Sequence, residues 1–198
     1  MNPMAIHASS IAMNRPRERF HHDGTAPARF TTAEFLRMAD LGAFEDMTVE
    51  LDHGELVRMN PPHGGHGAMQ AQVIAVLSQG MTGSGLTLSG EVGIMLGTDT
   101  VRAVDAALVA GAIEETGLLQ PEQVRLAIEI SDSTLDRDLG EKLRDYAAAG
   151  IAHYWVVDVK ARVVHVMAAP GGEAYDERTV VRFGEPLALP GGGTVVLG

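Results

Sequence analysis

Residues 124–130, with the sequence VRLAIEI, form a short and nearly continuous apolar run that contains one carboxylate, Glu129. A run of this kind, without polar alternation, is typical of a strand that is covered on both faces of a sheet. An ionised carboxylate in a dry interior destabilises a fold by several kcal/mol unless a cation or hydrogen bonds compensate it. The run therefore predicts a central sheet between two layers, and it makes Glu129 a candidate functional residue.

The segments around this strand predict an α+β fold in which a mixed central sheet is flanked by helices. The first predicted helix has the capping-box pair Thr31 and Glu34, and the last has Asp138 as its N-cap, which places Lys142 in the first turn. Helices are expected within residues 30–42, 68–80 and 138–150, and residues 61–67 are expected to form a loop. Strands or hairpins are expected within residues 47–62, 86–96, 100–110, 124–130, 151–168 and 179–198.

The length of 198 residues suits a single domain with a sizeable core. Residues 1–29 show no sustained periodicity and are expected to form a flexible N-terminal arm, in which the pair His21 and His22 either binds a metal or is simply polar. Residues 30–198 are expected to form the folded domain. The sequence has no cysteine and no apolar run long enough to cross a membrane, which favours a cytoplasmic protein without membrane contacts.

Two further carboxylates interrupt apolar strands in the same way. Glu50 is the centre of VEL at residues 49–51, and Asp105 is the centre of VDA at residues 104–106. Glu50 alone is compatible with a solvent-facing strand position, and Asp105 alone with a strand end or a buried salt bridge. Three acids in three strands favour a shared site, where a divalent cation such as Mg²⁺ would offset their charge with oxygen ligands.

Lys142 lies at the border of an apolar helix face. That face is expected to contain Leu139, Leu143 and Tyr146, which recur at helical spacing. The ammonium group of Lys142 could extend to solvent or pair with Asp138, four residues earlier. Alternatively it lies beside the carboxylates, where it would orient a water and offset negative charge on a phosphoryl group.

Three longer blocks of sequence resemble the Uma-two family of restriction-endonuclease-like proteins, a branch of the PD-(D/E)XK nuclease superfamily. The blocks are VELDHGELVRMNPPHGGHGAMQ, VRAVDAALVA and LAIEISDSTLDRDLGEKLRDYAAAGIAHYWVVD, and the resemblance covers about residues 30–190. The last block is the most specific, because an acid-bearing strand, a polar turn, the helix DLGEKL and the sequence HYWVVD follow in order. The resemblance implies a restriction-endonuclease-like fold with a divalent-metal site at the edge of its sheet.

The resemblance also implies which residues form the centre of that site. Asp105 and Glu129 match the family's metal-binding acids, and Glu50 matches an acid supplied from before the core sheet. The carbonyl group of Ile130 is expected as a backbone ligand of the metal. Lys142 matches a catalytic lysine that this branch carries on the helix after the second acid.

Further residues match the surroundings of the site. Ser131 stands where other branches place the catalytic lysine, two residues after the second acid. His66, Gln70 and Tyr146 match residues that support the site or contact the substrate, although His66 is also compatible with a polar helix end and Tyr146 with core packing. One departure is Val104, which stands where the family commonly has proline; because proline is not a ligand, metal binding is not affected.

These features favour a Mg²⁺- or Mn²⁺-dependent endonuclease that hydrolyses DNA phosphodiester bonds. The alternative is a nuclease fold that is kept for binding or assembly without catalysis. The net charge of −11 favours this alternative modestly, because non-specific DNA binding relies on Lys and Arg. The resemblance also implies a homodimer, and the apolar hairpin of residues 151–168 is expected to supply the strand edges for it.

Overall fold

The computed structural model describes residues 26–61, 64–113 and 117–198. The pair His21 and His22 and most of the predicted arm lie outside these residues. Arg29, the last residue of the predicted arm, forms a 2.9 Å ion pair with Glu55 and donates to the carbonyl group of His53, so contacts with the folded domain begin there. In the described ranges, no helix has the length and apolar character needed to span a membrane.

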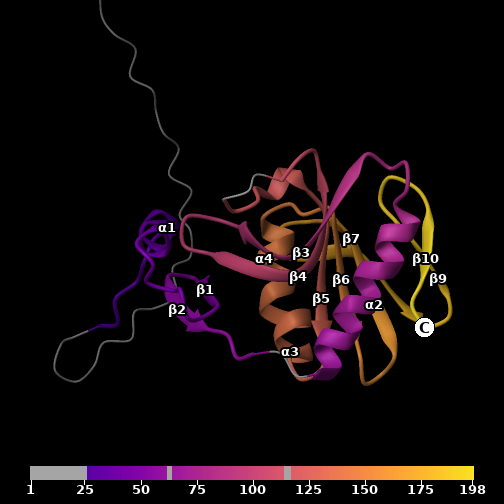
Figure 1. The fold of residues 1–198 in the computed structure, drawn as a ribbon, viewed down its shortest axis with the longest axis horizontal. Coiled ribbons are helices and arrows are strands. Elements are labelled where there is room, and N and C mark those ends of the chain that lie inside the picture. Colours follow the sequence, from indigo (N-terminus) through magenta and orange to yellow (C-terminus); the bar gives the residue numbers. More distant parts are fainter. Residues whose placement is uncertain (1–25, 62–63, 114–116) are drawn as a thin grey trace, which may run out of the picture.

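An eight-stranded mixed sheet forms the centre of the fold and confirms the predicted α+β class (Figure 1). The strands are β1 (Val49–Asp52), β2 (Glu55–Arg58), β3 (Leu86–Met95), β4 (Val101–Ala110), β5 (Val124–Ser131), β6 (His153–Asp158), β7 (Val163–Pro170) and β8 (Tyr175–Arg182). Their order is β2-β1-β4-β5-β6-β7-β8, and β3 pairs with β4. Only β5 and β6 pair in parallel, and the other neighbouring strands of the described sheet are antiparallel.

Helices cover both faces of this sheet (Figure 1). They are α1 (Thr32–Asp40), α2 (Gly64–Gly80), α3 (Leu135–Arg137), the π-helical segment η2 (Asp138–Lys142) and α4 (Leu143–Ala148), and a 3₁₀ turn, η1 (Pro121–Gln123), precedes β5. Helix α2 packs on one face together with a small ladder of β9 (Pro186–Ala188) and β10 (Thr194–Val196), whereas α4 packs on the other. The predicted capping box of Thr31 and Glu34 is confirmed at the start of α1.

Two predicted helix boundaries are wrong. Helix α2 begins at Gly64, so His66 lies on a helix and not in the predicted loop. The helix that carries Lys142 begins at Leu135, so Lys142 lies beyond its first two turns. Asp138 is not an N-cap: it is buried inside the helix, and its carboxylate accepts a hydrogen bond from the hydroxyl of Thr134. Asp138 and Glu141 have the spacing of a capping box, but Asp138 is buried within the helix and does not cap its start.

Strand β4 has two different partners along one of its edges. On the other edge, β3 pairs with it from Val101 to Ala110. On the divided edge, β1 pairs only at Val101, and β5 pairs from Ala106 onward. Among the described strands, residues 102–105 of β4 therefore have no partner on that side, and we call this gap the fork. Side chains can reach backbone groups at the fork that a neighbouring strand would otherwise occupy.

The prediction that the hairpin of residues 151–168 offers free edges for a second copy is wrong. Strand β6 lies between β5 and β7, and β7 lies between β6 and β8. The outer edge of β7 is paired with β8. The sequence predicted a closing strand only from residue 179 onward, so the first half of β8 was not expected. In the part of the chain that the structure describes, β8 is the strand that ends the sheet on this side.

Candidate active site

Asp105 lies at the end of the fork and connects β4 to β5 and α2. Its Oδ2 atom accepts a 2.7 Å hydrogen bond from the backbone N–H of Ile130, and its Oδ1 atom lies 3.0 Å from Nε2 of His66. One helical turn further along α2, Gln70 donates a 2.9 Å hydrogen bond to the backbone carbonyl of Asp105. The structure thus brings three other predicted site residues, Ile130, His66 and Gln70, together around Asp105.

His66 forms an ion pair with Asp105 when its imidazole is protonated. The hydrogen bond to Asp105 raises the pKa of His66 above its ordinary value, although partial burial acts in the opposite direction. The carboxylates of Glu129 and Glu91 act in the same direction as Asp105. The Asp105 carboxylate therefore favours the protonated form of His66, so His66 is more than a polar residue at a helix end.

Glu129 lies on β5 and points toward the helix that carries Lys142. It is 3% exposed, its Oε1 accepts a 2.7 Å hydrogen bond from the Tyr146 hydroxyl, and its Oε2 lies 2.9 Å from Nζ of Lys142. Burial raises the pKa of Glu129 to about 8; Asp105 and Asp138 act in the same direction, and Lys142 opposes them. Tyr146 therefore binds a candidate site residue in addition to packing in the core.

Lys142 is buried among carboxylates, which excludes the alternative that it extends to solvent. Burial lowers the pKa of Lys142, but the carboxylates of Glu129 and Glu50 outweigh it, and the pKa lies above its ordinary value. Its Nζ atom lies 3.6 Å from Glu50 and 4.0 Å from Asp138, so the predicted pair with Asp138 is the longest of its three contacts. The ammonium group therefore stays charged and links the acids of two strands.

Glu50 reaches the fork from β1. Its side chain is fully buried, which excludes a solvent-facing position. Its Oε1 atom accepts a 3.1 Å hydrogen bond from the backbone N–H of Ala103, one of the unpaired positions of β4. Its Oε2 atom lies 2.7 Å from a guanidinium nitrogen of Arg137 and 3.4 Å from one of Arg102. Glu50 thus accepts a hydrogen bond at the fork that a neighbouring strand would otherwise accept, and it binds two arginines.

Burial raises the pKa of Asp138, and a hydrogen bond from Ser131 acts to lower it. Among the described residues, Ser131 makes no hydrogen bond to the carboxylates of Asp105, Glu129 or Glu50. Its hydroxyl is 3.5 Å from that of Thr134, which donates in turn to Asp138. The hydroxyl of Tyr154 donates a 2.9 Å hydrogen bond to the backbone carbonyl of Asp138. Ser131 therefore belongs to the polar group that holds the start of the helix, while Lys142 brings the ammonium group from η2.

The three predicted acids offer the oxygen ligands that Mg²⁺ and Mn²⁺ prefer, so their chemistry fits such an ion. In the structure each acid contacts a basic side chain of the protein: Glu50 contacts Arg137, Glu129 contacts Lys142, and Asp105 contacts His66. The group of three whose ligand atoms lie within 4.8 Å of one another, among the described residues, consists instead of Asp52, His53 and Glu141.

This second group surrounds Arg102, a fully buried arginine on β4. One guanidinium nitrogen of Arg102 contacts Asp52 at 2.8 Å, Asp145 at 2.7 Å, and Glu141. Burial lowers the pKa of Arg102, but these carboxylates outweigh it, and the net shift is upward. The group is therefore an ion network centred on Arg102, which joins β1, β4 and the helix of Lys142.

Sequence reasoning missed Arg102 and Arg137. Arg102 lies within VRAV, so the rule that selected acids inside apolar strands would also have selected this cation. Arg137 lies before residue 138, where the sequence predicted the helix to start, so no position on the helix was expected for it. Both arginines bind Glu50, and they decide which charges the site carries.

Protonated His53 is expected to stabilise the fold. Its Nε2 atom lies 3.2 Å from Asp145, and this hydrogen bond raises the pKa of His53; Asp52 also raises it, whereas burial and Arg102 oppose the shift. Because the pKa is higher in the folded state, the stabilisation is fully present below the ordinary value of about 6.5 and is lost as the pH rises through the folded-state pKa.

The comparison is between wild type and His53→Asn, since asparagine tolerates the φ of 47° at this position. Thermal unfolding should show that a change from about pH 6 to about pH 8 lowers the Tm less in the variant, because the titrating pair is gone. The side chain is 44% exposed, so the difference corresponds to less than about 1 kcal/mol. The same pH dependence in both proteins would contradict this assignment.

Comparison with known proteins places these features beside a described family. The family model Uma2, described as "Putative restriction endonuclease", matches residues 32–193. The crystal structure of a protein from Anabaena variabilis ATCC 29413, described as a putative nuclease belonging to DUF820, is similar with a TM-score of 0.61. It is 20% identical and covers 81% of this chain and 88% of its own, so the likeness shows the fold alone. No curated protein matches the chain.

Proposed function

This chain belongs to the Uma2 family, whose model matches residues 32–193, and from that premise we propose that it is a metal-dependent endonuclease that hydrolyses DNA phosphodiester bonds. The observation that carries the proposal is the buried contact of Lys142 with Glu129 at 2.9 Å and with Glu50 at 3.6 Å, next to Asp105 at the fork. A carboxyl group with a raised pKa, here Glu129, that meets a charged lysine from a separate element is typical of catalytic sites.

Asp105, Glu129 and Glu50 would hold a Mg²⁺ or Mn²⁺ ion, with the carbonyl of Ile130 as a backbone ligand. Bound there, the ion would polarise the scissile phosphate and lower the pKa of an attacking water. Lys142 would orient that water and offset the charge that develops on the phosphoryl oxygens. Tyr146 fixes the direction of the Glu129 carboxylate and His66 that of the Asp105 carboxylate, while Gln70 binds the backbone carbonyl of Asp105.

Cleavage of supercoiled plasmid with Mn²⁺, Mg²⁺ or EDTA tests this proposal, with Lys142→Met beside wild type. We expect wild type to cleave with either ion and not with EDTA. The variant should cleave at least about 100-fold more slowly, because one charged group in a water-excluded site has effects of this size. Lys160→Met is the matched control: Lys160 is 71% exposed, so this variant should cleave like wild type. Wild-type cleavage by Lys142→Met would contradict the role of the lysine.

The second candidate is a nuclease fold that binds or assembles without catalysis. Two observations favour it: the net charge of −11, and the fact that each of the three acids already contacts a basic side chain of the protein. Calorimetric titration with Mn²⁺ separates the two functions. Tight binding to wild type supports the endonuclease, whereas absence of binding supports the module, because hydrolysis of the proposed kind requires the ion.

We further propose that two copies of the chain pair through β8. Most side chains of β8 are exposed, and it ends the described sheet. When two copies of β8 pair in antiparallel fashion, a two-fold axis perpendicular to the sheet relates them, and residues at equal distances from the axis lie opposite each other. This axis must lie at a residue position, because opposing side chains then lie on the same face of the sheet. An axis at Thr179 places Asp176 opposite the partner's Arg182, whereas axes at Arg178 or Val180 bring arginines into opposition.

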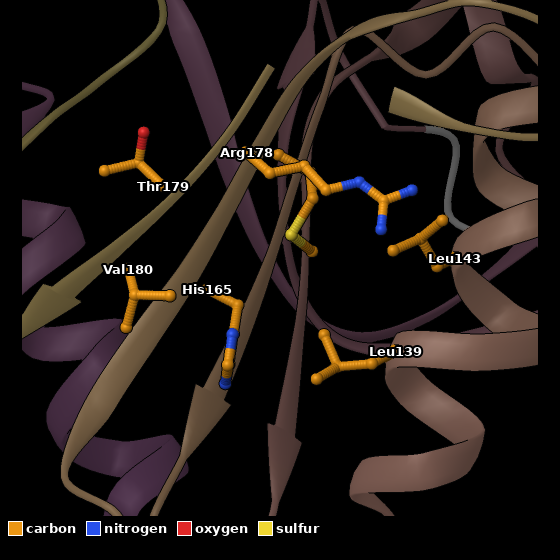
Figure 2. Close-up of a pocket in the computed structure, with 7 residues that line it drawn as sticks. Leu139, Leu143, His165, Arg178, Thr179 and Val180 are labelled. Carbon is orange, nitrogen blue, oxygen red and sulfur yellow. The ribbon is translucent and has the colours of Figure 1, made fainter. Parts of the chain in front are cut away.

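An apolar hollow of about 220 Å³ lies beside this strand and supports the same pairing. Figure 2 shows Leu139 and Leu143 projecting from the helix toward the strands that carry His165 and Arg178. Val180 at its rim is 58% exposed. The axis at Thr179 would bring the aliphatic stem of the partner's Arg178 over Val180, which covers this apolar surface.

A charge exchange tests the pairing and its register. Light scattering should report a dimer for wild type, a shift toward monomer for Asp176→Arg and for Arg182→Asp, and recovery of the dimer in the double variant, where the opposite charges face each other again. A monomeric wild type contradicts the pairing. Single variants that dimerise like wild type contradict the register.

A further inference from the structure

Arg137 is the most exposed of the four basic side chains that contact the predicted acids. Its side chain is 26% exposed, compared with 19% for His66, 5% for Lys142 and 0% for Arg102. It lies on α3, before the helix turns inward with Lys142. Its guanidinium group is therefore at the border between the buried acids and the solvent from which a nucleic acid would approach.

The guanidinium of Arg137 makes few strong contacts. Its one short ion pair is with Glu50 at 2.7 Å, and the next approaches, to Asp52 and to the sulfur of Met59, are both 3.9 Å. Five N–H donors are available on an arginine, and a guanidinium fits the geometry of a phosphate with two parallel hydrogen bonds. Most of its donors are thus free for an anion in the described surroundings.

Glu50 does not depend on Arg137 for compensation. Its carboxylate also accepts from the N–H of Ala103 at 3.1 Å and lies 3.4 Å from Arg102 and 3.6 Å from Lys142. Arg102 and Lys142 are buried and Ala103 is half-buried, and the three come from β4 and η2. Glu50 therefore keeps three partners after Arg137 has moved away, so Arg137 is the partner that can leave.

We propose that Arg137 exchanges Glu50 for a phosphate oxygen of the nucleic acid when a divalent cation occupies the acids. The exchange rests on the proposed function above. A divalent ion at Glu50 repels the guanidinium and competes for the same oxygen, while the phosphate offers Arg137 a new anionic partner. Arg137 is thus a counter-cation of the metal-free site and a phosphate-binding residue of the loaded one.

The first readout is metal affinity, measured by calorimetry with Mn²⁺ alone and no nucleic acid. Arg137→Gln should bind Mn²⁺ about tenfold more tightly than wild type, because a competing positive charge is removed from Glu50. Arg137→Lys, which keeps the charge, should lie between the two. Arg144→Gln removes the same charge from an exposed position of α4 and should bind Mn²⁺ like wild type.

The second readout is affinity for a phosphorothioate-linked DNA duplex with Mn²⁺ in excess, measured by fluorescence anisotropy. Arg137→Gln should bind at least about tenfold more weakly, with a salt dependence reduced by about one phosphate contact. Arg137→Lys should recover part of the affinity, and Arg144→Gln should not change it beyond about twofold. Thermal unfolding of each variant shows that the comparison is made on folded protein.

The outcomes distinguish the exchange from the function on which it rests. If wild type binds Mn²⁺ but Arg137→Gln binds it equally or more weakly, the exchange is wrong and the proposed nuclease stands. If the duplex affinity of Arg137→Gln equals that of wild type, the phosphate contact is wrong. If wild type binds no Mn²⁺, both the exchange and the proposed function are overturned.

Discussion

The Asp105→Asn protein is expected to keep its fold and to lose metal-dependent cleavage by at least about a thousandfold, or about 4 kcal/mol of transition-state stabilisation. Asparagine has nearly the same shape as aspartate, and its amide oxygen can still accept the hydrogen bond from Ile130 N–H, which is 2.7 Å long in the structure. What it lacks is the negative charge that a divalent ion needs. The substitution therefore separates the role of this side chain in the sheet from its role in chemistry.

Three measurements on the same preparation check this expectation. Plasmid cleavage should fall to the background of EDTA-treated protein, calorimetry should show weaker Mn²⁺ binding, and the unfolding free energy should change by less than about 1 kcal/mol. Asp136→Asn is the matched control, because Asp136 is exposed on α3 and its substitution removes the same charge. Cleavage that survives in Asp105→Asn would remove Asp105 from the metal site.

Replacing Arg102 by methionine is expected to have the largest effect on stability, lowering the free energy of unfolding by about 3–5 kcal/mol. Arg102 is fully buried and contacts Glu50, Asp52, Asp145 and Glu141. Methionine fills much of the same volume, so the loss is of charge more than of packing. The carboxylates that remain inside the protein then repel one another without a guanidinium between them.

Urea unfolding of wild type, Arg102→Met and Arg144→Met measures this difference. The exposed Arg144 should change the unfolding free energy by less than about 0.5 kcal/mol. Adding Asp145→Asn to Arg102→Met should restore part of the lost stability, because it removes one of the unpaired charges. Equal stability of Arg102→Met and wild type would show that the network adds nothing beyond its own desolvation.

The elements of the fold were largely predictable because their signals are local. Alternation, capping boxes and turn residues predicted the strands β1 to β7 and the start of α1, and the structure confirms them. The start of the helix before Lys142 was not predictable in this way. A buried aspartate and a capping aspartate look alike in sequence, and only the packing of Asp138 beneath Thr134 and Tyr154 distinguishes them.

The acids of the candidate site were predictable for a different reason. Glu129 and Asp105 interrupt apolar strands, and this conflict between burial and charge is visible in the amino-acid sequence itself. Their partners were harder to find, since the sequence predicted a turn at Arg137, which lies on α3, and its contact with Glu50 spans distant parts of the chain. The division of one edge of β4 between β1 and β5 leaves no trace in local pattern at all.

The fork also gives the protein two built-in spectroscopic probes. At Ala103 and at Ile130, a backbone amide donates to a side-chain carboxylate instead of a strand carbonyl. The amide proton shift depends on the charge of its acceptor, so nitrogen-15 correlation spectra would follow Glu50 at one resonance and Asp105 at the other. A titration could thus report the occupancy of each acid separately, without an attached reporter group, a substrate or an active enzyme.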